Sequence, residues 1–431
     1  MEDKTVRLCL LLLAILANAI MCPNNTAIAG NANLLLGFGA ESNAMGGTDM
    51  AYSDTPSGIN NNPAGIAQVR HSEIEFSIEP HVLAGIRHKD SLGNDRRTDH
   101  DRAYMFSGGW LSPLSGHPGV TVGVGLFAQG GVGFKYVGLL TDFDNHDDIS
   151  ALFGVFRIAP AIAWSLNNDL RLGLSVSINY AQAEQEVFPN TSDSGAGFFG
   201  TKITDVEGYS YSWRAGLQYD LGPTLSLGVA YGASTELKLK NGKAVVNFED
   251  IGLGRVHYAN AKIDGVSLPQ EIGLGLSWQV TPKLNLGADI NWYEWSEAIG
   301  LVRIILSNPQ ESSQVDEVNV ESSLGGADNF SKSVAAIYQI NDANIIYSGL
   351  SHTNNPISGS ALSPINNFTA KWHINLGYRH DFSAKWTGAL SYTYAPGNPR
   401  KYLSSERIPL GSASEEVFSF YSMVFSIRYK W

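Results

Sequence analysis

Aromatic side chains gather in two segments of the chain that could bind an apolar molecule. The first segment contains Phe134 and Tyr136, and the second contains Phe188, Phe198 and Phe199. Aromatic residues exposed on a long external segment favour a ligand groove. Packing of these rings against one another is the alternative. The chemistry that they offer is binding through apolar surface.

No pattern of nucleophiles, bases or metal ligands accompanies these aromatics. The sequence lacks the G-x-S-x-G, H-E-x-x-H, Walker and Rossmann patterns, and its 10 histidines are scattered without metal-ligand pairing. An acidic run at 142–148 lacks the glycine of an EF-hand loop, which leaves a solvated loop or weak divalent-cation binding. We therefore expect no enzyme activity, no cofactor and no metal site.

The composition excludes several classes of protein. Of 431 residues, 44% are hydrophobic and only 16% are charged, which excludes intrinsic disorder. The 29 basic and 41 acidic residues give a net charge of -12, which excludes a nucleic-acid binder with a basic surface. Two cysteines cannot build a disulfide scaffold.

The N-terminus has the pattern of a secretory signal peptide. Lys4 and Arg7 precede an apolar run at 8–17, which is too short to span a membrane. Small residues allow cleavage after Ala19 or Ala29. We favour the second site because the patterned sequence begins just after it. We therefore expect a signal peptide at 1–29, whose removal would take both cysteines with it.

After residue 70, the chain alternates between apolar and polar residues. Two architectures produce such strands: a soluble sandwich with its apolar face inside, and a membrane barrel with that face toward lipid. The strands are about 10–13 residues long, well beyond the soluble mode of about 5–6. Aromatic residues cluster at strand ends, and the chain closes on an alternating strand that ends at Trp431. These features favour the transmembrane barrel. Clear alternating segments begin near residues 170, 211, 272, 372 and 421.

Turn lengths alternate along the chain, as expected for short periplasmic turns and long external loops. The pattern predicts about 14 antiparallel strands in an all-β transmembrane barrel. Tight turns are expected at 167–169, 222–223, 281–283, 341–342 and 383–384. Long loops are expected near 132–150, 183–207, 238–267, 297–331 and 351–370.

Residues 30–69 do not alternate and are rich in Gly, Asn, Ser and Asp. A disordered leader is one interpretation. However, Met45, Met50 and Ile59 supply apolar anchors, and a barrel of this size has a lumen wider than its own side chains fill. We therefore expect an N-terminal hatch, or plug, at 30–69 and the barrel at 70–431.

Short motifs in this segment resemble the N-terminal signature of the FadL-type (OMPP1/FadL/TodX) outer-membrane transporters. They are Ala-Met-Gly-Gly at 44–47, Ala-Tyr-Ser-Asp at 51–54 and Asn-Pro-Ala-Gly-Ile-Ala at 62–67. The resemblance covers most of residues 30–431. Further matching segments lie at 158–164, 172–174, 211–219, 268–270, 292–296, 347–350 and 355–357.

The resemblance implies a 14-stranded barrel in the bacterial outer membrane that takes up long-chain fatty acids or other hydrophobic compounds. External loops would capture the molecule, and a gap at the kinked third strand would release it sideways. The implied partners are a hydrophobic small molecule, outer-membrane lipid and lipopolysaccharide, with no nucleic acid and a monomeric chain. The implied hatch motif comprises Gly46, Gly47, Asn62, Pro63, Ala64 and Gly65.

The third strand carries Gly130 and Gly131, which are our candidates for the lateral gap because glycine pairs mark bulges or kinks within strands. An ordinary strand end is the alternative. Family members often carry proline near this point, where this chain has Gln129.

A fatty-acid carboxylate would need basic partners, because a buried unpaired charge is costly. Candidates for this role are Arg157, Lys202 and Arg214. The acidic Glu184 and Glu186 lie nearby in the sequence and disfavour a carboxylate. Two other functions stay open: a general diffusion porin, and a barrel of the same fold that acts as a structural or secretion partner.

Overall fold

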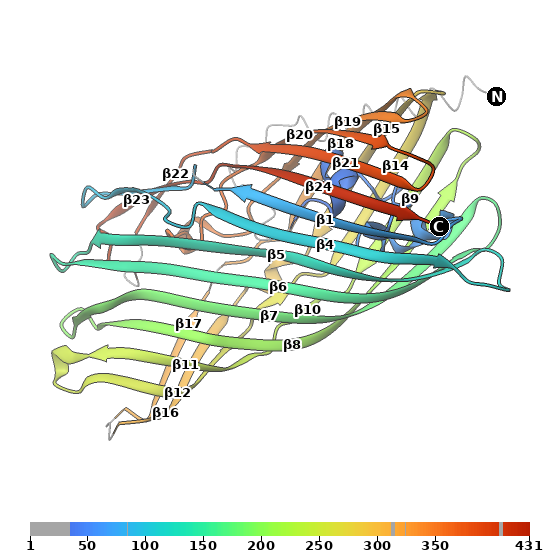
Figure 1. Ribbon diagram of the computed structural model, residues 1–431. Helices are drawn as coiled ribbons and strands as arrows, with labels where there is room; N and C mark the ends of the chain where they lie inside the picture. The colour runs from blue at the N-terminus through green and yellow to red at the C-terminus, as the bar shows by residue number, and fades with distance from the viewer. Residues whose placement is uncertain (1–34, 84, 312–314, 324, 405–407) are drawn as a thin grey trace.

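The computed structural model describes residues 35–83, 85–311, 315–323, 325–404 and 408–431. Within them, 14 antiparallel strands close into a barrel (Figure 1), which confirms the strand number and fold class expected from the sequence. The expected signal peptide at 1–29, and the beginning of the expected hatch at 30–34, lie outside the described residues.

The barrel strands follow one another around the wall in chain order. They are β1 (Glu73–Val82), β4 (Arg102–Pro113), β5 (Val120–Leu140), β6 (His146–Ser165), β7 (Leu170–Asp193), β8 (Phe198–Asp220), β9 (Leu225–Gly232), β14 (Glu271–Thr281), β15 (Leu284–Tyr293), β18 (Asn329–Asn341), β19 (Asn344–Thr353), β20 (Trp372–Asp381), β21 (Trp386–Ala395) and β24 (Phe420–Lys430).

The first and last strands close the barrel. Ile74 of β1 lies opposite Trp110 of β4 on one side and opposite Tyr429 of β24 on the other. Each strand thus has two neighbours, and closure leaves no long unpaired edge for aggregation.

The barrel has an apolar exterior and a polar interior. On β1, Ile74 and Phe76 are 50% and 55% exposed on the outer face, whereas the intervening Glu75 is 6% exposed on the inner face. Strict alternation requires this arrangement, since successive side chains point to opposite faces of a strand. An apolar outer band with a polar lumen is the pattern of a membrane barrel.

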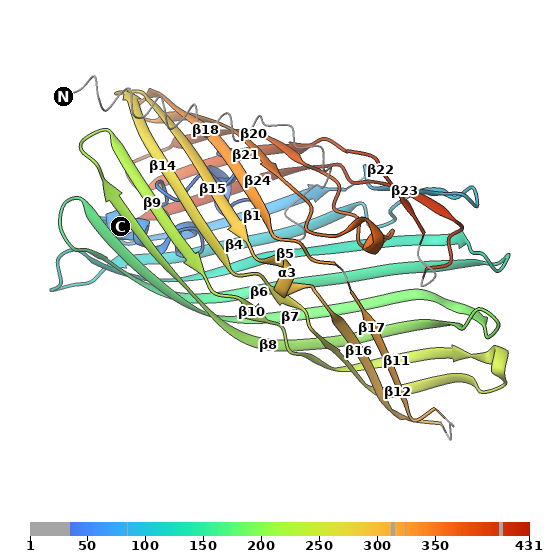
Figure 2. The same ribbon diagram turned by 180° about the vertical axis from the view of Figure 1, so that it is seen from behind.

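Four segments expected to be long loops contain strands instead. The strands β5 to β8 continue far beyond the barrel wall, and further strands join them there (Figures 1 and 2). Only the segment near 351–370 is largely irregular, with one short 3₁₀ helix. The joining strands are β11 (Leu239–Phe248), β12 (Gly254–Asp264), β16 (Val302–Pro309) and β17 (Glu317–Ser322).

Register shifts explain why these extensions were missed in the sequence. The pairing of β7 with β8 shifts between Ala183 and Gln185 and again between Val187 and Ser192. Each bulge reverses which residues face inward, so period-2 alternation is lost although the strand continues.

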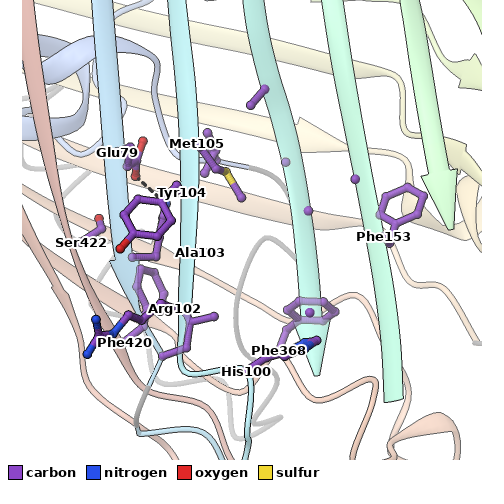
Figure 3. A pocket seen from close by; sticks show the side chains of 18 of the residues that line it. Glu79, His100, Arg102, Ala103, Tyr104, Met105, Phe153, Phe368, Phe420 and Ser422 are labelled. Carbon is purple, nitrogen blue, oxygen red and sulfur yellow. Dashed lines mark ion pairs between the residues drawn. The ribbon is translucent and has the colours of Figure 1, made fainter. Parts of the chain in front are cut away.

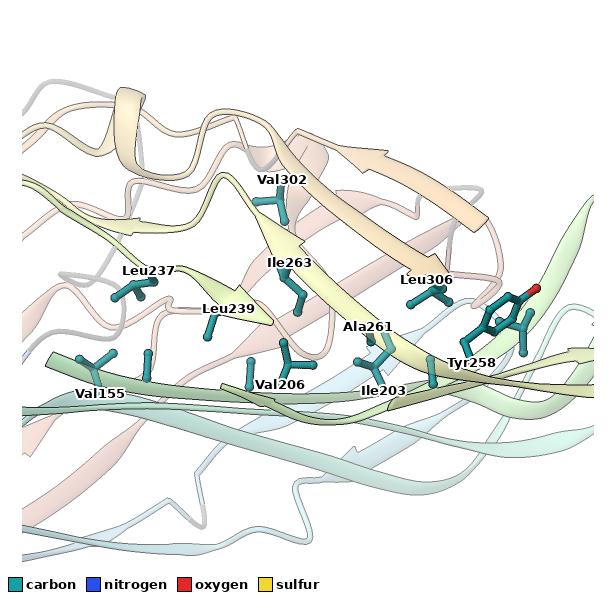
Figure 4. Packing of buried hydrophobic residues seen from close by; sticks show 14 of the residues in the cluster. Val155, Ile203, Val206, Leu237, Leu239, Tyr258, Ala261, Ile263, Val302 and Leu306 are labelled. Carbon is teal, nitrogen blue, oxygen red and sulfur yellow. The ribbon is translucent and has the colours of Figure 1, made fainter. Parts of the chain in front are cut away.

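The extension has its own apolar core between β7, β8, β11, β12 and β16 (Figure 4). Val206 and Leu239 face each other across it, with Tyr258 and Leu306 farther along the same layer. All four are buried. We expect this apolar core to stabilise the extension, whose strands continue beyond the barrel wall.

Two small sheets and six short helices complete the described residues. In these residues, no helix is long and apolar enough to cross a membrane. The remaining strands are β2 (Arg87–Asp90), β3 (Asp95–Arg97), β22 (Arg400–Leu403) and β23 (Ala413–Val417) in one sheet, and β10 (Thr235–Glu236) and β13 (Ser267–Leu268) in the other. The helices are α2 (Gly39–Ala44), η1 (Pro56–Ile59), η2 (Pro63–Gln68), η3 (Glu249–Ile251), α3 (Trp295–Ala298) and η4 (Gly359–Ala361).

Residues 35–69, which we call the hatch segment, lie inside the barrel. Lumen-facing glycines let its backbone approach the wall. A Cβ added at Gly228 would collide with the carbonyl of Met50, and one added at Gly349 would collide with the backbone of Met45. Such contacts leave no room for a side chain, so only glycine fits there. Other wall glycines that meet the hatch segment are Gly173, Gly216, Gly275 and Gly377.

Candidate functional site

A cavity of about 470 Å³ lies within the wall beside the hatch segment, between β1, β4, β5 and β6. Figure 3 shows side chains from distant parts of the chain around it, with Phe153 facing Tyr104 and Met105 across the space. Phe368 and Phe420 close it on the side of the extension. The volume and the mostly apolar lining suit one small organic molecule.

The end of this cavity nearest the hatch segment is polar. Glu79 and His81 of β1 lie there with Asn43 of α2. Asn43 Nδ2 donates to Glu79 Oε1 at 3.4 Å, and His81 Nε2 lies 3.0 Å from the same oxygen. The hatch segment therefore forms part of the cavity wall.

The pairing between β4 and β5 is interrupted beside the cavity. In the described residues, the ladder ends where Ser107 lies opposite Phe127. The next backbone bond across this boundary runs from Asp99 N to Lys135 O at 2.7 Å. We call the stretch between 102–106 of β4 and 128–134 of β5 the wall gap.

A bulge at Gln129 shapes the β5 side of the gap. Ala128 pairs with Phe156 of β6, but Gly130 pairs with its neighbour Val155, so Gln129 is the extra residue. The bulge exchanges the two faces of β5: odd-numbered Phe127 is buried inside before it, and even-numbered Phe134 is buried inside after it.

The exchange of faces turns small residues outward at the gap. Gly131 and Gly133 of β5 then lie on the outer face, beside Gly154 of β6, and all three line the cavity. Leu152 and Phe156, which are exposed on the lipid-facing side of β6, line it too. The cavity thus opens through the wall onto the apolar exterior.

A second cavity of about 700 Å³ lies farther out in the extension. Its walls are mainly apolar, with Trp295, Ile357 and Leu362 among them, and Glu184 is a carboxylate at its edge. Leu152, Phe153 and Phe368 line both cavities, so these side chains form the partition between them.

A buried ion pair holds the strands above the inner cavity. His88 of β2 contacts Glu416 Oε1 of β23 through Nδ1 at 2.6 Å and Asp90 Oδ2 through Nε2 at 3.0 Å. Burial alone would lower the pKa of His88, but these two carboxylates raise it to about 9. Ile86 and Phe418, next to this pair in the chain and in space, line the cavity roof.

Comparison with known proteins decides the family. The family model for outer membrane protein transport proteins (OMPP1/FadL/TodX) matches residues 36–387. The chain belongs to this family. It is therefore an outer-membrane protein of a transport family, as the sequence motifs indicated, and that family is not one of enzymes.

Several solved structures share the fold of this chain. The toluene transporter TodX of P. putida has a TM-score of 0.76 at 18% identity, covering 92% of this chain and 99% of its own. The toluene transporter TbuX of Ralstonia pickettii has a TM-score of 0.73 at 18% identity, with the same coverage. A Pseudomonas aeruginosa FadL homologue has 0.72 at 16%, again with 92% and 99% covered. Among curated proteins, none matches the sequence.

Most of the aromatic residues expected to line a ligand groove are packed in clusters of buried hydrophobic side chains. Phe134, Tyr136 and Phe188 are fully buried in one cluster, with Phe198 packed against it. Phe199 packs on Phe248 in the apolar core between β7, β8, β11, β12 and β16, with the two ring centroids 4.9 Å apart. None of these five lines either of the two large cavities.

The basic residues expected to bind a fatty-acid carboxylate contact other groups of the protein instead. Arg157 donates to Asn60 Oδ1 of the hatch segment at 2.9 Å and to Asn179 Oδ1 at 2.8 Å. Arg214 donates to Asn61 O at 3.1 Å and pairs with Glu271. Lys202, at the surface of the extension, pairs with Glu186. Arg157 and Arg214 thus connect the hatch segment to the wall.

The Asn-Pro-Ala-Gly motif makes a compact turn in the lumen. Asn62 caps η2 by accepting from Ala64 N at 3.1 Å, and its amide donates to Met50 O at 2.6 Å. Pro63 occupies the first position of η2, where a missing N–H costs nothing. Gly65 packs so closely on Ser53 that a Cβ would collide with it. Gly46 and Gly47 have positive φ values of 67° and 76°, which favour glycine.

Of the residues that line the inner cavity, the sequence singled out only Gly130 and Gly131 of the third strand, and it missed the polar ones. Glu79, His81 and His373 lie on β1 and β20, far apart in the chain, and meet only because the barrel closes. A usable signal existed on β1, where Glu73, Glu75 and Glu79 alternate with Ile74 and Phe76. That alternation shows an unusually acidic lumen face, although it does not locate a cavity.

Proposed function

We propose that this protein is a passive outer-membrane channel for hydrophobic molecules, such as hydrocarbons or long-chain fatty acids. The extension captures the molecule, the inner cavity accepts it, and the wall gap releases it sideways into the membrane. Gly130 and Gly131 belong to this exit. The hatch segment, with its motif at Gly46, Gly47 and 62–65, closes the direct path along the lumen.

One observation carries this proposal: the inner cavity opens through an interrupted strand pair onto the lipid-facing surface. A lipophilic molecule gains roughly 25 cal/mol for each Å² of apolar surface removed from water. Release into the bilayer keeps that surface out of water, whereas passage along the polar lumen would expose it. The wall gap is therefore the favourable exit.

The two cavities suit successive binding steps. The outer cavity is the larger and lies in the extension, and it shares Phe153 and Phe368 with the inner one. A rotation of these two rings would join the cavities. Solved relatives of the same fold are toluene transporters by name, which supports small hydrophobic molecules as substrates.

The apolar outer face supports direct contact with outer-membrane lipid and, on its outer leaflet, lipopolysaccharide. Because the barrel closes on itself, each chain carries its own cavities, hatch segment and wall gap. We therefore propose that the monomer is the functional unit.

A single substitution tests the exit. A Cβ added at Gly154 would meet nothing within 4 Å, so we expect Gly154→Phe to fold normally and its ring to fill the mouth of the gap. We expect uptake of a radiolabelled hydrocarbon by intact cells to fall severalfold. Leu274→Phe, on the exposed outer face of β14, is the matched control. Full uptake by a correctly folded Gly154→Phe variant would contradict release at this gap.

A further inference from the structure

The inner end of the cavity carries more polar groups than a hydrocarbon needs. Glu79, His81 and His373 line it and are 7%, 7% and 5% exposed. Both imidazoles contact Phe420, each with its ring centroid 5.8 Å from the phenyl ring. Two buried histidines thus pack against one aromatic side chain of the cavity wall (Figure 3 shows Phe420 and Glu79).

Each of these histidines has a ring nitrogen without a hydrogen bond among the described residues. They are His81 Nε2 and His373 Nδ1, both of which are enclosed by protein atoms, so a ligand reaches either nitrogen only after its ring rotates. His81 Nε2 is 3.0 Å from Glu79 Oε1, but it is not aligned for a hydrogen bond. Buried polar groups are normally satisfied, and an unsatisfied one destabilises the site until a partner arrives.

The surrounding groups restrict what that partner can be. Glu79 places a carboxylate at this end, which disfavours a second carboxylate. The only Lys or Arg lining the cavity within the described residues is Arg102, which is exposed to solvent. Rings of Phe368, Phe418 and Phe420 form one apolar side of the cavity. Glu79 disfavours an anion, and the apolar wall makes the desolvation of a cation costly, so the best partner is an uncharged molecule that is polar at one end and apolar at the other.

A hydroxyl group meets these conditions better than a carbonyl group. A neutral imidazole offers one donor and one acceptor, and which nitrogen carries the proton depends on its surroundings. A hydroxyl both donates and accepts, so it can bond either form. A cavity of about 470 Å³ accommodates a one-ring or two-ring molecule.

We propose that the inner cavity selects uncharged hydrophobic molecules that carry a hydroxyl group, such as phenols and aromatic alcohols, with His81 and His373 as their hydrogen-bonding partners. This inference rests on the proposed function, because it assigns a substrate class to the same cavity. A site built to bond a hydroxyl discriminates strongly against an analogue that lacks it, since its own polar groups are then left unpaired.

Three ligands of similar shape test the inference on the purified full-length barrel at neutral pH. They are naphthol, methylnaphthalene and naphthoate, whose dissociation constants are measured by equilibrium dialysis. We expect naphthol to bind at least about tenfold more tightly than either of the others, as one additional hydrogen bond allows. Simple partition would give the opposite order for naphthol and methylnaphthalene, since methylnaphthalene is the more apolar molecule.

Substitution of the histidines tests whether they cause the preference for naphthol over methylnaphthalene. His81→Leu, His373→Leu and their combination should bring naphthol to the affinity of methylnaphthalene, while methylnaphthalene itself binds as before. His117→Leu, at an exposed turn position outside both cavities, is the control and should keep the preference.

The outcomes separate this inference from the proposed function. Equal affinities for naphthol and methylnaphthalene, tighter binding of naphthoate, or a preference that survives in the double variant would each overturn the hydroxyl selection alone. If none of the three ligands binds the unmodified protein, the proposed function itself is contradicted.

Discussion

Arg428 of the last strand donates a hydrogen bond of 2.7 Å from Nη2 to Oε1 of Glu41, which lies 387 positions earlier in the hatch segment. The other oxygen of Glu41 accepts from Tyr347 at 2.6 Å and lies 3.6 Å from Arg379. One buried carboxylate thus connects the hatch segment to three strands of the wall. Arg428 also lies 3.7 Å from Glu75, so the network is shared.

Glu41→Gln should loosen the hatch segment. Removing one charge of a buried ion pair typically costs about 3–5 kcal/mol, because the remaining charge is left unpaired. We expect single-channel recordings to show more frequent openings, and the thermal unfolding midpoint to fall. Glu321→Gln removes a charge from an exposed pair with Arg303 and should change neither property. A closed, equally stable Glu41→Gln protein would show that the network does not hold the hatch segment.

Deletion of residues 35–69 should convert a nearly non-conducting barrel into an open pore. The hatch segment contacts the wall on many sides, through Arg157, Arg214 and Asp289 among others. Without it, the polar lumen would admit ions. Planar-bilayer conductance measures the change, and unchanged conductance would exclude the plug. High conductance of the intact protein would instead favour a general diffusion porin.

The extension should lose stability as the pH rises from about 6.5 to 9. His88 has a pKa of about 9 in the folded protein, raised by its carboxylate partners, against an ordinary 6.5. A raised histidine pKa contributes stability that is complete below the unfolded value and is lost as pH rises through the folded one.

Hydrogen exchange of the β2 and β23 amides, corrected for intrinsic rates, measures this effect. We expect protection to fall over that pH range, by up to about 3 kcal/mol for the histidine alone. His88→Gln should remove most of the pH dependence. Protection that is constant from pH 6.5 to 9 in the unmodified protein would show that the ion pair does not stabilise the extension.

Neutral hydrophobic ligands should bind at least as well as fatty acids. Glu184 lies at the edge of the outer cavity, and Glu186 already neutralises Lys202. An anionic head group there meets repulsion of about 1 kcal/mol per close pair, or roughly fivefold in affinity. Competition binding at neutral pH compares a fatty acid with its alcohol.

Charge reversal tests the cause of that preference. Glu184→Lys with Glu186→Lys should improve binding of the fatty acid and leave its alcohol unchanged. Asp316→Lys with Glu317→Lys changes the net charge equally, at exposed positions outside the cavities. A clear preference of the unmodified protein for the carboxylate would reject the prediction. It would also restore Arg157, Lys202 and Arg214 as candidates for head-group binding.

Alternation predicted the strands from the sequence, as in the segment that becomes β7. Strand length and aromatic residues at strand ends then favoured a membrane barrel over a soluble sandwich. The strand number followed from the spacing of tight turns. Apolar anchors such as Ile59, together with short glycine and asparagine motifs, indicated the hatch.

The cavities could not be predicted in the same way. Their walls combine residues such as His81, His373 and Phe420, which come together only through barrel closure. The bulge at Gln129 also reverses the faces of β5, so Phe134 and Tyr136 read as loop residues although they lie in a strand. Both effects depend on register, which local composition does not reveal.

Photo-crosslinking in a lipid bilayer tests lateral release most directly. A hydrophobic ligand with a photoreactive group would be added to the reconstituted protein, and the labelled peptides identified by mass spectrometry. We predict labels on Trp295 in the outer cavity, Phe420 in the inner one, and Tyr104 and Phe156 on the outer face at the wall gap. Labels that continue along the lumen past Asn62 to the short turns, with none on the outer face, would contradict the account.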